Sequence, residues 1–435
     1  MAKAYDAIVI GAGVIGAAIA LGLARKGRKT LAIDKLPAAG YGSTSGSCAI
    51  IRPFYSTVDG SALAYESHFY WKEWDDYLGA KDERGLARYV NCGSFVVKCA
   101  RNKYLGPVLK VMQEIGCPYR ELPPEEVKKK LPFVFLESFD PPRRPEDPLF
   151  SHSNGEQLPG VVHFTTSGYV NDPQLATHNL QVAAEAEGAE FLFNAEIVSI
   201  DRRNGRVAGV TLKSGEPIAA PVVVNVAGPH SFKINRMADV EGGMNIKTKA
   251  LRHEVAHVPS PAGFDYEHNG LHFSDQDTSC YARPEIGNHI LIGSEDPECD
   301  TKEWVVDPDN FNREFTEQWR VQVMRMAQRF TTLPIPNKMK GLVELYDVSD
   351  DWIPIYDKSD LPGFYMAVGT SGNQFKNAPI VGEMMAELVT ACENGRDHDK
   401  DPVPFHLKHI DRTVSLGFYS RRRQPDKRSS FSVLG

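Results

Sequence analysis

One lysine of the sequence lies where a positive charge could bind an anion. Lys376 lies in the small polar segment TSGNQFKNAP, residues 370–379, immediately before the helical pattern PIVGEMMAELV. The peptide dipoles already concentrate positive charge at a helix N-terminus, so a cation just ahead of one favours an anion-binding site. A solvated surface lysine beside a helix cap is the alternative interpretation.

A second chemical signal is the glycine motif GAGVIG, which follows an apolar run and starts a predicted helix. Gly11 permits a tight turn, Gly13 lets the backbone approach a pyrophosphate, and Gly16 lets the helix pack closely on the strand. Asp34 ends the next predicted strand and can accept a hydrogen bond from a ribose hydroxyl. The motif predicts a site for an ADP-containing dinucleotide, with cofactor-binding residues Gly11, Gly13, Val14, Ile15, Gly16, Asp34 and Lys35.

The motif alone leaves FAD and NAD open. Later segments return to strand-and-glycine patterns, VVVNVAG and MAVGTSGNQF, which could complete the same nucleotide-binding layer. A simple nicotinamide enzyme would instead add a separate substrate domain. This pattern favours FAD, and NAD binding by a colourless protein would favour the other interpretation.

Composition narrows the class of protein. The chain has 435 residues, is 42% hydrophobic and carries a formal net charge of −7, which gives no basic field for nucleic acid. Seven cysteines without a CxxC pair argue against a disulfide framework and fit a reducing compartment. The thirteen histidines show no ligand spacing, so we expect no metal site. The apolar stretch at 7–24 contains four glycines and lies behind a flank with charges of both signs, which indicates neither a signal peptide nor a membrane span. We expect a cytoplasmic protein.

Periodicity predicts the order of the elements. The chain opens with strand, helix and strand, and a helix is expected from about residue 60 to 78. An antiparallel meander is predicted within 190–217, with turns at NG and SG. Strands are expected at 248–258, 278–294 and 363–369, and a helix within 309–329. The proline-rich stretch 132–159 is expected to be a long irregular excursion.

Six segments resemble, in the expected order, the D-amino-acid oxidase superfamily of FAD enzymes, and more closely its sarcosine oxidase and dimethylglycine dehydrogenase branch. They span residues 5 to about 390: YDAIVIGAGVIGAAIALGLARKG, GSTSGSCAIIRPFY, GYVNDPQLATHNLQVAAEAEGAE, VVVNVAGPHS, YARPEIGNHILIGSED and GTSGNQFKNAPIVGEMMAELV.

The resemblance implies an α/β (α+β) fold, with a Rossmann-like FAD-binding domain that is discontinuous in sequence and a substrate domain built on a mixed or antiparallel sheet. The implied FAD-binding domain comprises 1–88, 156–230 and 337–400. The implied substrate domain comprises 89–155 and 231–336, and 401–435 form a C-terminal extension.

The resemblance also implies roles for individual residues. Arg52 and Lys376 would hold the substrate carboxylate, since arginine offers a planar fork and lysine a compact charge. Lys376 could also stabilise the reduced flavin. Tyr281 and Arg283 would line the substrate cavity, and Glu295 could balance a substrate ammonium. The further implied cofactor-binding residues are Ser43, Thr44, Ser47, Ile197, Ala227, Gly228, Gly372, Asn373, Gln374, Phe375 and Lys376.

Two departures from the pattern of the branch matter. Glu344 stands where monomeric sarcosine oxidase has the cysteine that carries covalent flavin, and GSTSGS contains no histidine, so the FAD is expected to be non-covalent. Leu291 stands where sarcosine oxidase has the lysine that promotes oxygen reduction. A dehydrogenase that passes electrons to another acceptor is therefore as plausible as an oxidase.

The implied activity is oxidation of the C–N bond of a small amino acid or N-methylated secondary amine, by hydride transfer to flavin N5 and hydrolysis of the imine. The expected partners are this substrate and, as electron acceptor, either O2 or a redox partner, without nucleic acid or an integral membrane segment. Two alternatives stay open: oxidation of a 2-hydroxy acid, and a non-catalytic flavoprotein subunit.

Overall fold

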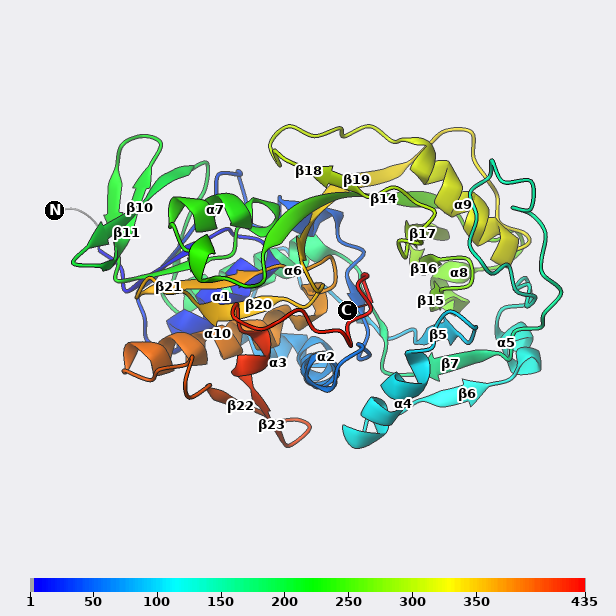
Figure 1. Cartoon of the computed structure of the whole chain (residues 1–435), viewed down its shortest axis with the longest axis horizontal. Coiled ribbons are helices and arrows are strands. Elements are labelled where there is room, and N and C mark those ends of the chain that lie inside the picture. The colour runs from blue at the N-terminus through cyan, green and yellow to red at the C-terminus, as the bar shows by residue number, and fades with distance from the viewer. Residues whose placement is uncertain (1–3, 435) are drawn as a thin grey trace.

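A computed structural model describes residues 4–434 and places two large sheets side by side (Figure 1). The first sheet has six strands, and all of its neighbouring pairs are parallel except the antiparallel edge pair β20–β21. Its order is β20 (Ile355–Lys358), β21 (Phe364–Val368), β13 (Val222–Asn225), β1 (Ala7–Ile10), β2 (Thr30–Ile33) and β9 (Glu190–Leu192). The strands come from distant parts of the chain.

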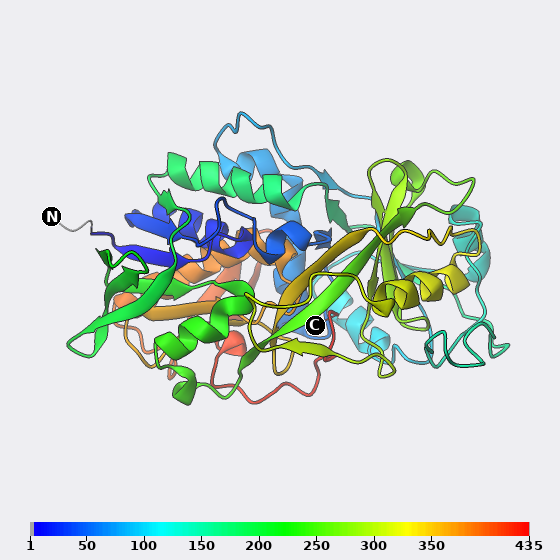
Figure 2. The ribbon, with the colours of Figure 1, turned by 90° about the horizontal axis from the view of Figure 1, so that it is seen from above.

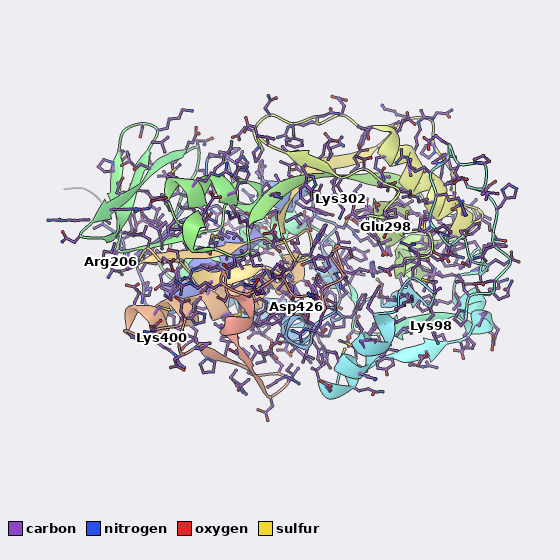
Figure 3. The ribbon with its side chains drawn as sticks, viewed as in Figure 1. Lys98, Arg206, Glu298, Lys302, Lys400 and Asp426 are labelled. Atoms are coloured by element: carbon purple, nitrogen blue, oxygen red, sulfur yellow. The ribbon has the colours of Figure 1, made fainter. Side chains whose placement is uncertain are left out.

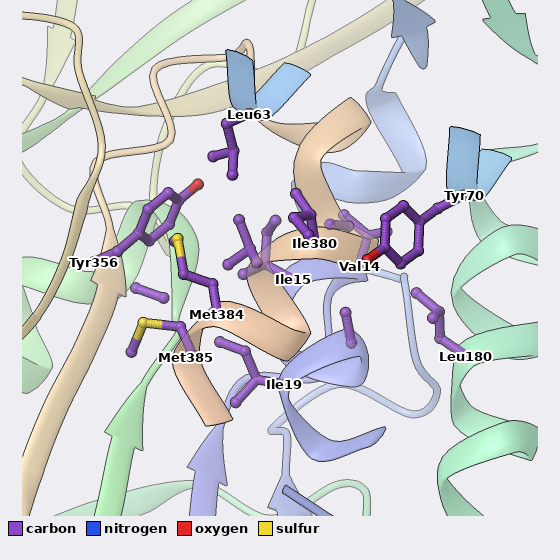
Figure 4. Packing of buried hydrophobic residues seen from close by; sticks show 14 of the residues in the cluster. Val14, Ile15, Ile19, Leu63, Tyr70, Leu180, Tyr356, Ile380, Met384 and Met385 are labelled. Atoms are coloured by element: carbon purple, nitrogen blue, oxygen red, sulfur yellow. The ribbon is translucent and has the colours of Figure 1, made fainter. Parts of the chain in front are cut away.

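The two faces of this sheet pack on different elements because successive side chains of a strand point to opposite sides. Ala7 and Val9 belong to the cluster that includes α1 (Val14–Arg25), α10 (Ala378–Glu393) and α6 (Pro173–Ala186), and Figure 4 shows Ile15, Ile19 and Met384 within it. Ile8 and Ile10 pack on the other side. The elements there are α7 (Ser231–Met237) and the meander of β10 (Ile197–Arg203), β11 (Arg206–Leu212) and β12 (Pro217–Ala219).

The second sheet has nine strands and is mostly antiparallel. Its order is β18 (Glu303–Val305), β14 (Thr248–Pro259), β17 (His289–Ser294), β16 (Cys280–Glu285), β15 (His272–Asp275), β5 (Ser94–Val97), β7 (Val161–Phe164) and β6 (Arg120–Leu122), and β19 (Gly341–Ser349) also pairs with β14. Apolar residues of one face pack on helix α9 (Glu317–Arg329), α5 (Pro124–Lys130) and α8 (Tyr266–Asn269). On the opposite face, Val255, Tyr281 and Leu291 pack with Cys48 from the loop before β3 (Ile50–Ile51).

The remaining elements join or cover the two sheets. They are α2 (Val58–Lys72), α3 (Trp74–Leu78), α4 (Leu105–Glu114), the small sheet of β3 (Ile50–Ile51), β8 (Gly168–Val170) and β4 (Tyr89–Val90), and the hairpin of β22 (Pro404–Leu407) and β23 (Arg412–Ser415). The helix predicted at 60–78 is thus two helices, and the one predicted within 309–329 begins only at Glu317. The mixed α/β class and the meander are as predicted.

The domain boundaries stay a prediction, and at two strands they do not follow the division between the two sheets. Strands β7 and β19 fall in ranges predicted for the FAD-binding domain, yet both belong to the nine-stranded sheet. Within residues 4–434, no helix is both long and apolar enough to cross a membrane. Charged side chains such as Lys98, Arg206 and Lys400 lie at the periphery (Figure 3).

Candidate active site

One large cavity, of about 620 Å³, is lined by residues of both sheets and of the loops between them. Every predicted site residue except Arg283 lines it. These are Gly11, Gly13, Val14, Ile15, Gly16, Asp34, Lys35, Ser43, Thr44, Ser47, Arg52, Ile197, Ala227, Gly228, Tyr281, Glu295, Gly372, Asn373, Gln374, Phe375 and Lys376. Segments separated by more than three hundred residues in sequence therefore meet around a single space.

The glycine motif forms a crowded turn at one end of the cavity. Gly11 has φ of +106°, and a Cβ there would lie 2.5 Å from the carbonyl oxygen of Val226. A Cβ on Gly16 would lie 1.9 Å from the carbonyl oxygen of Gly11, so neither position tolerates a side chain. The backbone N–H of Ala12 donates to Asp34 Oδ2 at 2.7 Å, which fixes the carboxylate beside the turn. The start of α1 and an acid are thus held together, as nucleotide binding requires.

The segment after β2 closes on the start of α1. Thr44, in the short helix η1 (Ser43–Gly46), accepts a hydrogen bond at its Oγ1 from the N–H of Val14 at 3.2 Å. Ile197 enters the cavity from the beginning of β10, and Ala227 follows the end of β13. Strand ends and helix starts therefore supply this end of the cavity.

An ionic cluster that sequence analysis missed covers the same end of the cavity. Lys35 forms an ion pair with Asp309 and lies 3.0 Å from His230 Nε2. His230 Nε2 and Lys233 Nζ lie 2.9 and 3.0 Å from the Asp309 carboxylate. Burial would raise the pKa of Asp309, but hydrogen bonds from Lys35, Lys233 and His230 hold it below its usual value. These ion pairs therefore hold loop 306–313 over the nucleotide end of the cavity.

Removal of the ion pairs of Asp309 should speed the loss of bound cofactor. We expect Asp309→Ala to raise the dissociation rate of bound dinucleotide about 5-fold, because a network of half-exposed ion pairs contributes about 1 kcal/mol. Salt should speed release from the native protein in the same direction, since it screens exposed charges. The measurement is the fluorescence of released flavin as NaCl is raised. Asp397→Ala breaks an exposed pair with Lys400 away from the cavity, and equal release from both variants would contradict the role of the loop.

Lys376 lies at the other end of the cavity and is 3% exposed, so the surface-lysine interpretation is wrong. Its backbone carbonyl accepts hydrogen bonds from Ser67 Oγ and Trp71 Nε1, both at 2.6 Å, which ties the short helix η4 (Phe375–Asn377) to α2. Its Nζ donates to Tyr55 Oη at 3.0 Å and to the carbonyl of Asn373. Burial, together with the charge of Arg52, holds the pKa of Lys376 well below its ordinary value.

Arg52 lies next to Lys376, with Tyr55 between them. The Arg52 guanidinium carbon is 4.7 Å from the centre of the Tyr55 ring, and Lys376 Nζ is 5.0 Å from it. Arg52 is 5% exposed, and its Nη groups donate to the backbone carbonyls of Phe54 and Val433. Tyr55, which sequence analysis missed, thus sets the spacing between the two cations.

Neither cation has an anionic partner among residues 4–434. The other buried arginines differ: Arg325 pairs with Asp300 at 2.7 Å, and Arg329 pairs with Asp275 at 2.7 Å. A buried charge is costly unless an opposite charge compensates it. Two buried basic side chains that border one cavity, without a carboxylate partner among the described residues, are therefore suited to binding an anion.

A buried carboxyl lies in the same part of the cavity. Glu295 is 4% exposed, and its Oε1 accepts a hydrogen bond from Ser274 Oγ at 2.6 Å, whereas its Oε2 has no partner among the described residues. Burial raises the pKa of Glu295 to about 8, although the hydrogen bond from Ser274 and the charge of Arg52 oppose the shift. Oε2 is therefore free to accept a proton or hydrogen bond from a ligand.

His272 is a further polar residue of the cavity that sequence analysis missed. Its Nδ1 lies 2.7 Å from Ser94 Oγ, and it is 3% exposed. Burial, followed by the charges of Arg52 and Lys376, lowers the pKa of His272 to about 3. The imidazole is neutral at pH 7, so it adds no positive charge beside Arg52 and Lys376 and is a much weaker base than the Glu295 carboxylate.

Arg283 does not line the cavity, which corrects the prediction. It lies on the same face of β16 as Tyr281, but its Nε donates to the carbonyl of Cys48 at 2.8 Å and its guanidinium lies 4.4 Å from the centre of the Tyr169 ring. Its charge is paired with Glu285 at 2.9 Å. Alternation along the strand gave the correct face, while neighbouring backbone and an aromatic ring cover the side chain.

Comparison with known proteins identifies the family. Residues 6–388 match the family DAO, described as FAD dependent oxidoreductase. The chain belongs to this family. It is therefore an FAD-dependent oxidoreductase, and the predicted resemblance to the D-amino-acid oxidase superfamily is confirmed.

Individual relatives of this DAO-family oxidoreductase are distant. Glycine oxidase of Geobacillus kaustophilus (strain HTA426) is 22% identical over 427 residues, which cover 94% of this chain and 98% of that protein. A bifunctional amine oxidase of Dictyostelium discoideum is 30% identical over 132 residues, which cover 30% of this chain and 12% of that protein.

Solved structures share the fold of the oxidoreductase. L-proline dehydrogenase from P. horikoshii has a TM-score of 0.75 and 20% identity, with 97% of this chain and 98% of that chain covered. The crystal structure of glycine oxidase from Geobacillus kaustophilus has a TM-score of 0.71 and 18% identity, with 97% and 99% covered.

The cavity of the oxidoreductase fits FAD. The side-chain-free turn at Gly11 and Gly16 leaves room for a pyrophosphate, and Asp34 stands where a ribose would lie. At the other end, the buried Asn373 Nδ2 has no partner among the described residues and borders the cavity, as a donor to a flavin ring would. Glu344 lines the cavity without a thiol for attachment, so the FAD is proposed to be non-covalent.

Proposed function

We propose that this oxidoreductase oxidises the C–N bond of a small amino acid or N-methylated amino acid. The pair of buried basic side chains, Arg52 and Lys376, carries the proposal, because neither has a carboxylate partner among the described residues and both lie in one cavity with the carboxyl of Glu295. An amino acid offers a carboxylate and an amine close together, which matches this distribution of charge. The names of its relatives, glycine oxidase and L-proline dehydrogenase, support an amino acid as the substrate class.

The two cations would fix the acid end of the substrate. Arg52 retains N–H groups beyond the two given to carbonyls, since a guanidinium carries five. Lys376 has one N–H left after its bonds to Tyr55 and Asn373. Two fixed donors that hold one end of a small molecule also orient the carbon next to its nitrogen. Such orientation of the reacting atoms lowers the entropic part of the reaction barrier.

Glu295 would handle the proton of the amine. Amine oxidation requires a nitrogen lone pair, so an ammonium must lose a proton before or as the C–H bond breaks. Glu295 Oε2 is unpartnered and can accept that proton, and Ser274 holds the other oxygen of the carboxyl. When bound, FAD supplies the acceptor for the hydride, and the imine product is hydrolysed in water.

The charge pattern favours an amine over a 2-hydroxy acid. Both would satisfy Arg52 and Lys376, but a hydroxyl brings no positive charge to Glu295. An amine can share its proton with a buried carboxyl, which stabilises the pair in a site of low dielectric constant. The amine substrate therefore offers a partner to each of the three ionisable groups, Arg52, Lys376 and Glu295.

An anaerobic screen tests the proposal. Purified holoenzyme is mixed without oxygen with glycine, N-methylglycine, proline, larger amino acids of both chiralities and 2-hydroxy acids, and loss of flavin absorbance is followed. We expect bleaching by an amino or N-methylamino acid, and admission of air then shows whether peroxide forms. Bleaching by hydroxy acids alone, or by none of these compounds, would contradict the proposal.

A further inference from the structure

The last described residues of the chain return to the middle of the molecule, next to the substrate end of the cavity. The last described residues, coloured red, lie centrally in both views (Figures 1 and 2). The carbonyl oxygen of Val433 accepts a hydrogen bond from Arg52 Nη2 at 2.6 Å, and both Val433 and Leu434 line the cavity. We name residues 429–434 the terminal strap.

The strap is a fixed part of the fold. Upstream of it, Arg421 is fully buried and pairs with Asp357 and Asp399 at 3.0 and 2.9 Å. Arg423 pairs with the buried Asp351 at 2.7 Å. These ion pairs, each with at least one buried partner, hold the segment in place, because losing one partner would leave a buried charge without compensation.

Apolar packing holds the strap itself. Val433 is 9% exposed and packs with Leu251, Val348 and Trp352, which belong to β14, β19 and the loop after β19. Leu434 is 5% exposed and joins the large cluster of the first sheet. The strap therefore spans from one sheet to the other across the cavity wall, with apolar side chains turned inward.

We propose that the terminal strap is the specificity-determining wall of the substrate site. This inference rests on the proposed function, in which Arg52 holds the substrate carboxylate. The Val433 carbonyl takes one N–H of Arg52 and thereby fixes the plane of the guanidinium toward the cavity. Val433 and Leu434 close the space beside that guanidinium, so substrates with little bulk near the carboxylate are accepted and larger ones are rejected.

The chemistry of the contact favours positioning over blocking. A neutral carbonyl binds a guanidinium more weakly than a carboxylate does, because the carboxylate adds the attraction of an opposite charge and can accept two parallel N–H bonds. The carbonyl also leaves further N–H groups of Arg52 unused. Arg52 is thus oriented by the strap while its charge remains available to the substrate.

Removal of the strap from folded holoenzyme tests the proposal. A site-specific protease sequence is inserted after the exposed Arg428, ahead of the buried Ser429. The protein is loaded with FAD, and the strap is then cut off and its release checked by mass spectrometry. We expect the Kd of acetate, measured from the absorbance change of bound flavin, to rise about 10-fold. The kcat/KM ratio of a bulky to a small amino acid should rise about 10-fold as well, because apolar walls discriminate by this order.

Matched variants separate the wall from general damage. Leu434→Ala widens the wall in an uncut chain and should raise the same kcat/KM ratio about 3-fold, whereas Phe431→Ser changes an outward side chain of the same strap and should leave it unchanged. The uncut insertion protein is the control for the inserted sequence.

The outcomes distinguish the two proposals. Unchanged acetate Kd and unchanged kcat/KM ratio after strap removal, with Arg52→Ala still weakening acetate, would overturn the strap and leave the proposed function standing. If Arg52→Ala also leaves the Kd of acetate unchanged, the carboxylate site itself is wrong and the strap proposal is overturned with it.

Discussion

We expect Arg52→Ala to raise the Kd of a carboxylate ligand, and the KM of an amino-acid substrate, by at least about 30-fold. Removing one partner of a buried, hydrogen-bonded charge pair costs about 2–5 kcal/mol, and each 1.4 kcal/mol is a factor of ten. Arg52 is 5% exposed and borders the cavity beside the buried Lys376, so little water can replace it. The measurement is a titration of bound flavin absorbance with acetate, followed by steady-state kinetics.

Two controls show whether a weaker affinity for acetate comes from the loss of a specific carboxylate contact. An amine of the same size without a carboxylate should bind native protein and Arg52→Ala with similar affinity, because it has no group for the guanidinium. Arg313→Ala removes a positive charge from the nucleotide end of the same cavity and should leave the acetate Kd within about 2-fold, since its side chain is exposed and screened. Equal effects of Arg52→Ala and Arg313→Ala on acetate would contradict a specific carboxylate site.

Local sequence patterns were sufficient where a function depends on neighbours in sequence. The turn at Gly11 and Gly16 needs residues without side chains at fixed spacing, and the structure places both where a Cβ would collide with backbone. The segment around Lys376 likewise contains its own helix start. In both places the local geometry follows from a short stretch of chain, so the sequence alone predicts the turn and the helix start.

Long-range packing decided the rest. Loop 306–313 is polar and carries no motif, and only its approach to Lys35 and Lys233 makes it part of the nucleotide end. The sequence predicts only a C-terminal extension at the terminal strap, because nothing in its residues SSFSVL indicates a return to Arg52. Arg283 shows that a correctly predicted strand face does not by itself place a side chain in the cavity, because Cys48 and Tyr169 cover it.

The second large effect concerns pH. We expect kcat/KM of the native enzyme to rise with pH through an apparent pKa of about 8, which is the value that burial gives to Glu295. Below this pH the carboxyl is neutral and the substrate is an ammonium, so the site holds one proton too many beside Arg52 and Lys376. Glu295→Gln should abolish this rise and lower kcat/KM at pH 9 about 100-fold, the lower bound for loss of a general base. Persistence of the transition at about pH 8 in Glu295→Gln would contradict the assignment.

Thermal unfolding gives a readout of Glu295 that does not depend on turnover. Its pKa is raised to about 8 in the folded chain from its ordinary value of 4.5, so between these values the folded state holds a proton that the unfolded state has already lost. The stability of the native protein should therefore fall as pH rises through this window, and the loss should be complete above about pH 8. Glu295→Gln cannot ionise, so its Tm should exceed that of the native protein at pH 9 by more than at pH 5. A Tm difference that does not change with pH would mean that folding does not raise the pKa of Glu295. A carboxyl of ordinary pKa would already be ionised at neutral pH in the absence of an amine substrate.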